Sequence, residues 1–168
     1  MVNTRYIERP ICRQCNYQHK NSLTKFLYHL LEYLTIFLIG GFVYVCIELL
    51  YRGHSHWSMF IVGGLCLLIV GMLNDGLFPS SFGIIPQMIM GAIIITCIEF
   101  IAGLIVNVWL GLGVWDYSNL PLNIMGQICL PFTLAWFLLS GVAIVVDDYI
   151  RYRFFGEPKP TYKLWMDE

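Results

Sequence analysis

The chain has 168 residues, of which 58% are apolar and 15% aromatic, whereas only 12% are charged. Soluble domains carry about 25% charged residues, and a soluble chain of this length could not cover so many apolar side chains. The formal net charge is −1, so no strongly basic or acidic face suggests a nucleic-acid partner. The composition therefore predicts an all-α integral membrane protein whose partner is the lipid bilayer.

The first 22 residues are polar and basic, and we expect them to form a cytoplasmic tail. They contain Cys12 and Cys15 with His19, which are three of the four ligands that a structural zinc site requires. The pair His54 and His56 in the first loop also lacks a clear third ligand. The sequence therefore predicts no metal and no cofactor.

Four apolar runs follow, each near the 20 residues needed to cross about 30 Å of hydrocarbon. They predict a transmembrane domain over residues 23–150, with spans at about 34–51, 57–73, 84–110 and 124–149. The mixed stretch 24–33 is expected to form the interfacial first turns of the first helix. A proline and glycines in the connector 76–83 separate the second helix from the third.

The distribution of Lys and Arg predicts the orientation. Five of these residues precede the first span, four follow the last, and only Arg52 lies between spans. Four spans place both termini on one side, and the positive-inside rule makes that side the cytoplasm. Residues 151–168 are then a second cytoplasmic tail. The expected location is the cell membrane, as a multi-pass protein of a bacterial plasma membrane.

Two glutamates lie inside the predicted spans at the ends of similar phrases. Glu48 ends Val45-Cys46-Ile47-Glu48, and Glu99 ends Thr96-Cys97-Ile98-Glu99. A carboxylate at the centre of a spanning helix costs roughly 2.5–3.5 kcal/mol. We therefore interpret the pair as a proton or cation site, or as an acid/base pair. The alternative is a structural hydrogen bond between helices. The matching phrases also suggest two parallel two-helix repeats.

The loop 115–123 gathers further candidate substrate-binding residues. These are Asp116, Tyr117, Asn119 and Asn123. Because the loop follows the Glu99 helix, Asp116 and Tyr117 are expected to line the same cavity as Glu99. The other interpretation is that they are interface anchors, turn residues and, for Asn123, a cap of the fourth helix. No recognised catalytic motif occurs, so no catalytic residue is assigned.

Asp147 and Asp148 precede Arg151 at the predicted inner end of the fourth helix. The spacing of Asp147 and Arg151 predicts an i,i+4 pair at the cytoplasmic end of the helix, which contributes a few tenths of a kcal/mol. We assign it no function.

Several phrases together resemble one bacterial family, the putative ABC-transporter permease, type IV (CmpB-like). The resemblance covers roughly residues 25–165. The phrases are Ile98-Glu99-Phe100, Gly103, Trp115-Asp116-Tyr117-Ser118, Asn123, Gly126, Trp136-Phe137 and the tail from Gly156 to Leu164. Glu48 also falls where the family places an acid in its first helix. The resemblance implies a membrane subunit of a transporter powered by a separate ATPase. This chain itself has no G-x-x-x-x-G-K-[ST] motif for binding a nucleotide.

Three functions therefore remain open. The first is a transport subunit in which Glu48 and Glu99 form a polar patch and the 115–123 loop guards its outer mouth. Four helices are few for a permease, so that function implies a homo-oligomer or a partner. The second is a small membrane-embedded enzyme that uses Glu99 and Asp116 as an acid/base pair on a lipid-like substrate. The third is a non-catalytic assembly or regulatory protein.

Overall fold

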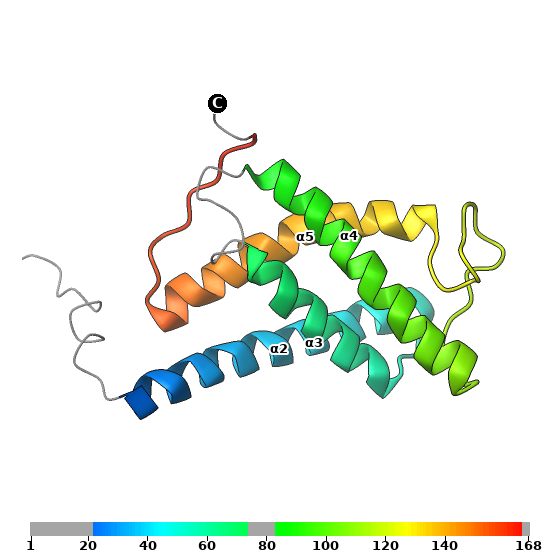
Figure 1. Cartoon of the computed structure of the whole chain (residues 1–168), viewed down its shortest axis with the longest axis horizontal. Helices are drawn as coiled ribbons and strands as arrows, with labels where there is room; N and C mark the ends of the chain where they lie inside the picture. The colour runs from blue at the N-terminus through cyan, green and yellow to red at the C-terminus, as the bar shows by residue number, and fades with distance from the viewer. Residues whose placement is uncertain (1–21, 74–82, 166–168) are drawn as a thin grey trace, which may run out of the picture.

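The computed structural model describes residues 22–73 and 83–165, which form an antiparallel arrangement of four helices. The helices are α2 (Ser22–Arg52), α3 (Trp57–Gly71), α4 (Ile84–Gly103) and α5 (Leu130–Ile150). The π-helical turns η2 (Leu104–Trp109) and η3 (Arg151–Phe155) extend α4 and α5. Figure 1 shows α2 and α4 running in one direction and α3 and α5 in the other. Within the described ranges no β-strand forms, and the expected all-α fold is confirmed.

Three of the four helices are long and apolar enough to cross a membrane. They are Ser22–Arg52, Ile84–Trp109 and Leu130–Phe155, with 31, 26 and 26 residues. Helix α3 has only 15 residues, or about 22 Å at 1.5 Å per residue, which is less than the hydrocarbon thickness. The prediction of four apolar helices is confirmed, but α3 falls short of the predicted full span.

Large apolar side chains point outward along the helices. Leu50 is 89% exposed, Trp109 79% and Leu138 65%. Exposed patches of this kind are rare on soluble monomers, and hydrocarbon would cover them in a membrane. The exposure pattern thus agrees with the membrane class that the composition predicts.

The fourth helix begins later than the sequence indicates. It starts at Leu130 instead of near Ile124. The backbone has positive φ at Leu122, Met125 and Gly126 (50°, 53° and 69°), which no right-handed helix accommodates. These residues form turns closed by an isolated bridge between Ile124 and Ile128. The apolar run continues across this turn, so hydropathy alone could not locate the helix start.

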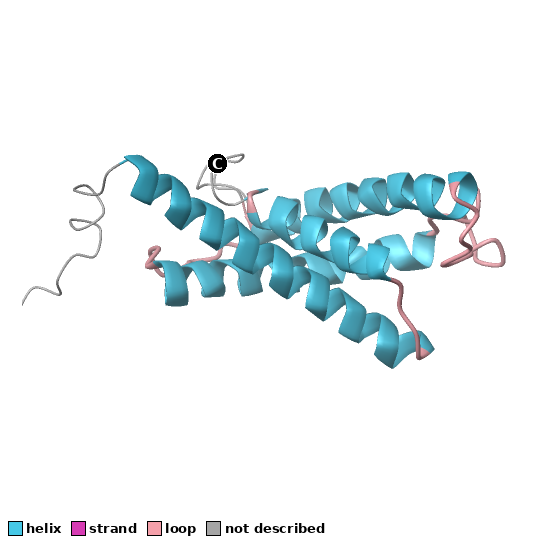
Figure 2. Cartoon of the chain, turned by 90° about the horizontal axis from the view of Figure 1, so that it is seen from below, coloured by secondary structure: helices cyan, strands magenta, loops and turns pink. Residues whose placement is uncertain are grey.

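Helices α2 and α3 approach closely through glycines. A Cβ on Gly63 would lie 2.2 Å from the Tyr44 Cβ and 2.9 Å from the Gly40 carbonyl oxygen. Only glycine fits at this contact, as expected for small residues between membrane helices. The packing holds α2 against α3 along much of the length of α3 (Figure 2).

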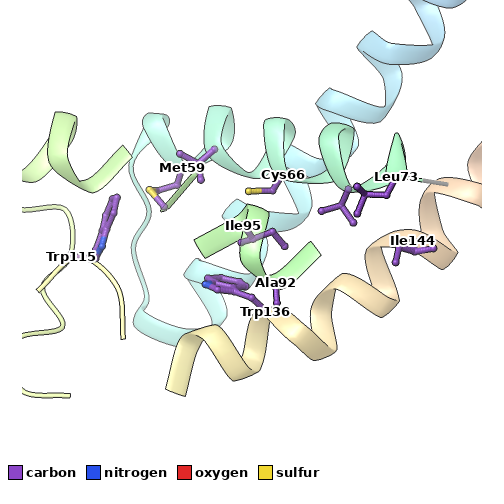
Figure 3. Close-up of a cluster of buried hydrophobic side chains, with 10 residues drawn as sticks. Met59, Cys66, Leu73, Ala92, Ile95, Trp115, Trp136 and Ile144 are labelled. Atoms are coloured by element: carbon purple, nitrogen blue, oxygen red, sulfur yellow. The ribbon is translucent and has the colours of Figure 1, made fainter. Parts of the chain in front are cut away.

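The apolar core lies where α3, α4 and α5 meet. Figure 3 shows Cys66 of α3, Ala92 and Ile95 of α4, and the Trp136 indole of α5 in one cluster. Trp115, from the loop after η2, closes the end of this core nearest the outer loop. All five side chains are at most 8% exposed. The core therefore ties the outer loop to the helices.

The C-terminal segment returns from η3 to the start of α4. Gly156 ends η3 with φ of 77°, and the chain then reaches the first turn of α4. There the amides of Ile84 and Ile85 donate to the carbonyls of Lys163 and Leu164, at 2.7 and 3.2 Å. Helix N-termini leave such amides without intrahelical partners, and α4 has no side-chain cap. The tail therefore caps α4.

Tyr162 anchors this tail, because its hydroxyl donates to Asp148 Oδ2 of α5 at 2.8 Å. Burial, and secondarily the Asp148 carboxylate, raises the pKa of the Tyr162 phenol. A group whose folded pKa is raised contributes its stability below the ordinary pKa, about 10 for tyrosine, and loses it as pH rises through the folded value. The docked tail should therefore be released under strongly alkaline conditions.

We expect Tyr162→Phe to make tryptic cleavage after Lys163 about two- to tenfold faster. This range corresponds to the loss of about 0.5–1.5 kcal/mol for one hydrogen bond. Tyr149→Phe, at an exposed position of α5, is the control and should leave the cleavage rate unchanged. Equal cleavage of both variants and wild type at neutral pH would show that the Tyr162 bond does not hold the tail.

Candidate functional site

Glu99 lies near the end of α4 and is 2% exposed. Its Oε1 accepts a hydrogen bond from the Tyr117 hydroxyl at 3.1 Å, and its Oε2 accepts one from the Trp136 indole Nε1 at 2.7 Å. Both donors are neutral. Among the described residues, no Lys, Arg or His forms an ion pair with Glu99. The carboxyl group is thus hydrogen-bonded but not compensated by a protein cation.

Aromatic rings from three parts of the chain surround this carboxyl group. Tyr117 comes from the outer loop and stacks on Phe132, with 4.6 Å between ring centroids. Trp136 comes from α5 and stacks with Tyr44 of α2 at 5.9 Å. Burial, and then the Glu99 charge, raises the pKa of Tyr117 well above its ordinary value. The phenol therefore stays protonated and remains a donor to Glu99.

Glu48 has a different environment. It lies one turn before the end of α2 and is 9% exposed. It forms an ion pair with Arg52, four residues later, and accepts from the Ser55 hydroxyl at 2.5 Å. Arg52 also donates to the Val114 carbonyl of the outer loop at 2.8 Å. Glu48 is therefore compensated by a cation and links α2 to two loops.

Asp116 does not contact Glu99. It is exposed, and its Oδ1 accepts from the Ser118 amide at 2.8 Å and the Ser118 hydroxyl at 2.5 Å. These hydrogen bonds lower the pKa of Asp116. The contact that an acid/base pair of Glu99 and Asp116 would need is thus missing from this arrangement.

The two predicted asparagines belong to the loop itself. The Asn123 side chain donates to the carbonyls of Ser118 and Leu120 and accepts from the Gly126 amide. It does not cap α5, whose N-cap residue is Cys129. Asn119 is exposed in the turn. Of the six predicted residues, Glu99 and Tyr117 are the two that a hydrogen bond joins.

A network that the sequence did not indicate holds the outer loop in place. Asn107 of η2 donates to the Gln127 side chain at 2.8 Å and accepts from the Val114 amide at 2.7 Å. The Trp115 indole donates to the Gln127 carbonyl at 3.0 Å. Asn107 therefore holds the loop that carries Tyr117. A lone amide in an apolar helix was the available signal.

A second buried network lies at the opposite end of the helices. Arg151, 2% exposed, donates to Asp147 Oδ2 and to Glu32 Oε1, each at 2.7 Å. The expected i,i+4 pair between Asp147 and Arg151 is confirmed, but it is buried. Glu32 of α2, 119 positions from Arg151, joins it and is buried as well. Spacing along one helix could not reveal the partner from another helix.

The histidines and cysteines considered above as metal ligands do not form a site in the part of the chain that the structure describes. No group of three or more His, Cys, Asp or Glu occurs there with metal-binding geometry. His56 caps α3, because its ring accepts from the Ser58 amide at 3.3 Å. Cys12, Cys15 and His19 lie outside the described residues, as does the connector from 76 to 82.

Apolar helices of spanning length, together with carboxylates buried between them, define a helical membrane protein. Comparison with known families matches residues 22–166 of the chain to the family described as Putative ABC-transporter type IV. The chain therefore belongs to this family, which confirms the family that the sequence phrases resemble. No curated protein and no solved structure matches the chain.

Proposed function

We propose that the protein is the membrane subunit of a transporter driven by a separate ATPase, and that Glu99 holds a proton or a substrate cation on the transport path. The family supports the first part of this proposal. In the proposed orientation the helices cross the cell membrane in several passes with both termini in the cytoplasm. Its support is the location of nine of the ten Lys and Arg residues before Leu34 or after Tyr149.

The contrast between the two glutamates carries the assignment of Glu99. Glu48 has Arg52 as its cation, whereas the described contacts of Glu99 are two neutral donors. A buried charge without a partner is costly, so such a group is neutralised by a proton or by a bound cation. A cation therefore binds more favourably at Glu99 than at Glu48. Glu48 serves to fix the outer loop.

The neighbours of Glu99 have positioning roles in this proposal. Tyr117 and Trp136 each hold one carboxylate oxygen, and the loop network of Asn107 and Gln127 fixes the segment that carries Tyr117. The contacts of Asp116 with Ser118 favour this function over the enzyme with a Glu99–Asp116 pair. In transport, only Glu99 must bind the ion.

The transport assignment is tested by purifying the tagged full chain from its own host in mild detergent and measuring the mass of the intact complex. We expect a stoichiometric subunit with ATPase activity. Glu99→Gln should keep the complex, because an amide fits the same space, but should abolish substrate-dependent stimulation of ATP hydrolysis. Glu48→Asp, which keeps a carboxylate beside Arg52, is the matched control and should retain stimulation.

A bare homo-oligomer without an ATPase would overturn the proposed function. That outcome would instead favour an assembly protein or a self-contained membrane enzyme. Equal stimulation in wild type and Glu99→Gln would leave the transporter assignment standing but remove Glu99 from the path.

A further inference from the structure

An apolar cleft of about 180 Å³ lies between α2, α3 and α5. It is open on the side between α2 and α5, where the lining residues Val43, Ile47 and Val142 are exposed. In a membrane this opening would face hydrocarbon. Its inner wall includes the buried side chains of Cys66, Ile95 and Trp136, together with Tyr44.

The inner wall of the cleft is directly coupled to Glu99. Trp136 both lines the cleft and donates its indole N–H to Glu99 at 2.7 Å. Tyr44 stacks with Trp136, and both Tyr44 and Cys66 also line the cleft. Glu99 therefore lies immediately behind an aromatic wall. Among the described residues that line the cleft there is no Lys, Arg or His.

Aromatic faces attract cations, most strongly where water is excluded. A carboxylate that accepts the indole N–H of the same wall adds to that attraction, because it raises the electron density of the ring system. A carboxylate that pairs with no Lys, Arg or His of the described residues, reached through an apolar opening, is thus complementary to a ligand that is both cationic and apolar.

We infer that the cleft binds a lipophilic organic cation, meaning a quaternary or protonated amine that carries one apolar ring or short chain. The ligand would enter from the hydrocarbon between α2 and α5 and place its charge against the Tyr44 and Trp136 rings, in front of Glu99. A cavity of 150 Å³ accommodates benzene, so a cleft of about 180 Å³ holds a ligand with a single ring. This inference rests on the proposed function and specifies the substrate class.

Two probes of the same shape distinguish the effect of a positive charge on affinity from the effect of filling the cleft with apolar groups. Benzyltrimethylammonium carries a quaternary nitrogen where neopentylbenzene has a carbon atom, and the two molecules are otherwise matched. Binding of each to the full chain in lipid nanodiscs can be measured by equilibrium dialysis, with empty nanodiscs as the blank. We expect the cation to bind the protein about tenfold or more tightly than the neutral probe, from the strength of a desolvated cation–π contact.

Two variants test the position and the charge. Glu99→Gln should weaken binding of the cation about tenfold, which equals 1.4 kcal/mol, and leave binding of the neutral probe unchanged. Val142→Trp places a large ring at the exposed mouth and should weaken both probes. Thermal unfolding of each variant, followed by tryptophan fluorescence, confirms that the fold is retained before binding is compared.

Equal affinity for the two probes would overturn the inference and would indicate that the cleft binds lipid chains. The inference would also be overturned if Glu99→Gln left the affinity for the cation unchanged. Neither result would overturn the proposed function if the complex with the ATPase still forms and a hydrophobic carbodiimide still modifies Glu99. Loss of the complex with cation binding intact would instead overturn the proposed function alone.

Discussion

Replacement of Arg151 by leucine is expected to destabilise the protein by about 3–5 kcal/mol, the range found when one partner of a buried ion pair is removed. The side chain is 2% exposed and donates to both Glu32 and Asp147. Leucine would leave two carboxylates buried beside each other without this cation. Because Glu32 belongs to α2 and Asp147 to α5, the loss should separate these two helices at the end of the bundle where the C-terminal tail docks.

The measurement is thermal unfolding in detergent, followed by tryptophan fluorescence, which reports on the buried Trp115 and Trp136. Arg153→Leu, two residues later at an exposed position, is the matched control and should change stability by less than about 0.5 kcal/mol. Arg151→Lys should be intermediate, because a lysine keeps the charge but cannot present two fixed donors. A loss below 1 kcal/mol in Arg151→Leu would contradict a central role for this network.

A hydrophobic carbodiimide is expected to modify Glu99 in the full chain and to spare Glu48. Reagents of this class react with protonated carboxyl groups in apolar surroundings. Glu99 has no protein cation among its described contacts, whereas Glu48 forms an ion pair with Arg52. Modification at Glu99 should exceed that at Glu48 about tenfold or more, a ratio that corresponds to 1.4 kcal/mol of preferential pairing at Glu48.

Mass spectrometry of the labelled peptides assigns the modified residue. Glu99→Gln should abolish the main product, and Glu48→Gln should leave it in place. The yield at Glu99 should fall as pH rises, since only the protonated acid reacts. Equal modification of the two glutamates, or modification of Glu48 alone, would contradict the interpretation that Glu99 is the carboxyl group without a compensating cation.

Local patterns were sufficient where a side chain's role depends on its own segment. The apolar runs predicted four helices, and the end of the third was placed within a residue or two of Trp109. The positions of Glu48 and Glu99 within such runs also marked both as costly carboxylates. The start of α5 was missed because positive φ at Met125 and Gly126 leaves no trace in hydropathy.

The candidate site was predictable only in part. Tyr117 was placed near Glu99 from chain order alone, since the loop follows the Glu99 helix. Trp136 was known only as part of a family phrase, and its bond to Glu99 depends on how α5 packs against α4. Asp116 and Asn123 looked equally suited to a site, but short-range hydrogen bonds within the loop engage both.

The sequence by itself determined the membrane class, the helical fold, the family and the presence of two glutamates within apolar runs, because composition and hydropathy are properties of segments. Only the tertiary structure distinguished Glu48 from Glu99 and joined Glu32 to Arg151. Each of those outcomes depends on which charges and donors meet across helix contacts. Electrostatic compensation acts over a few ångströms in space, and residues far apart in the chain supply it.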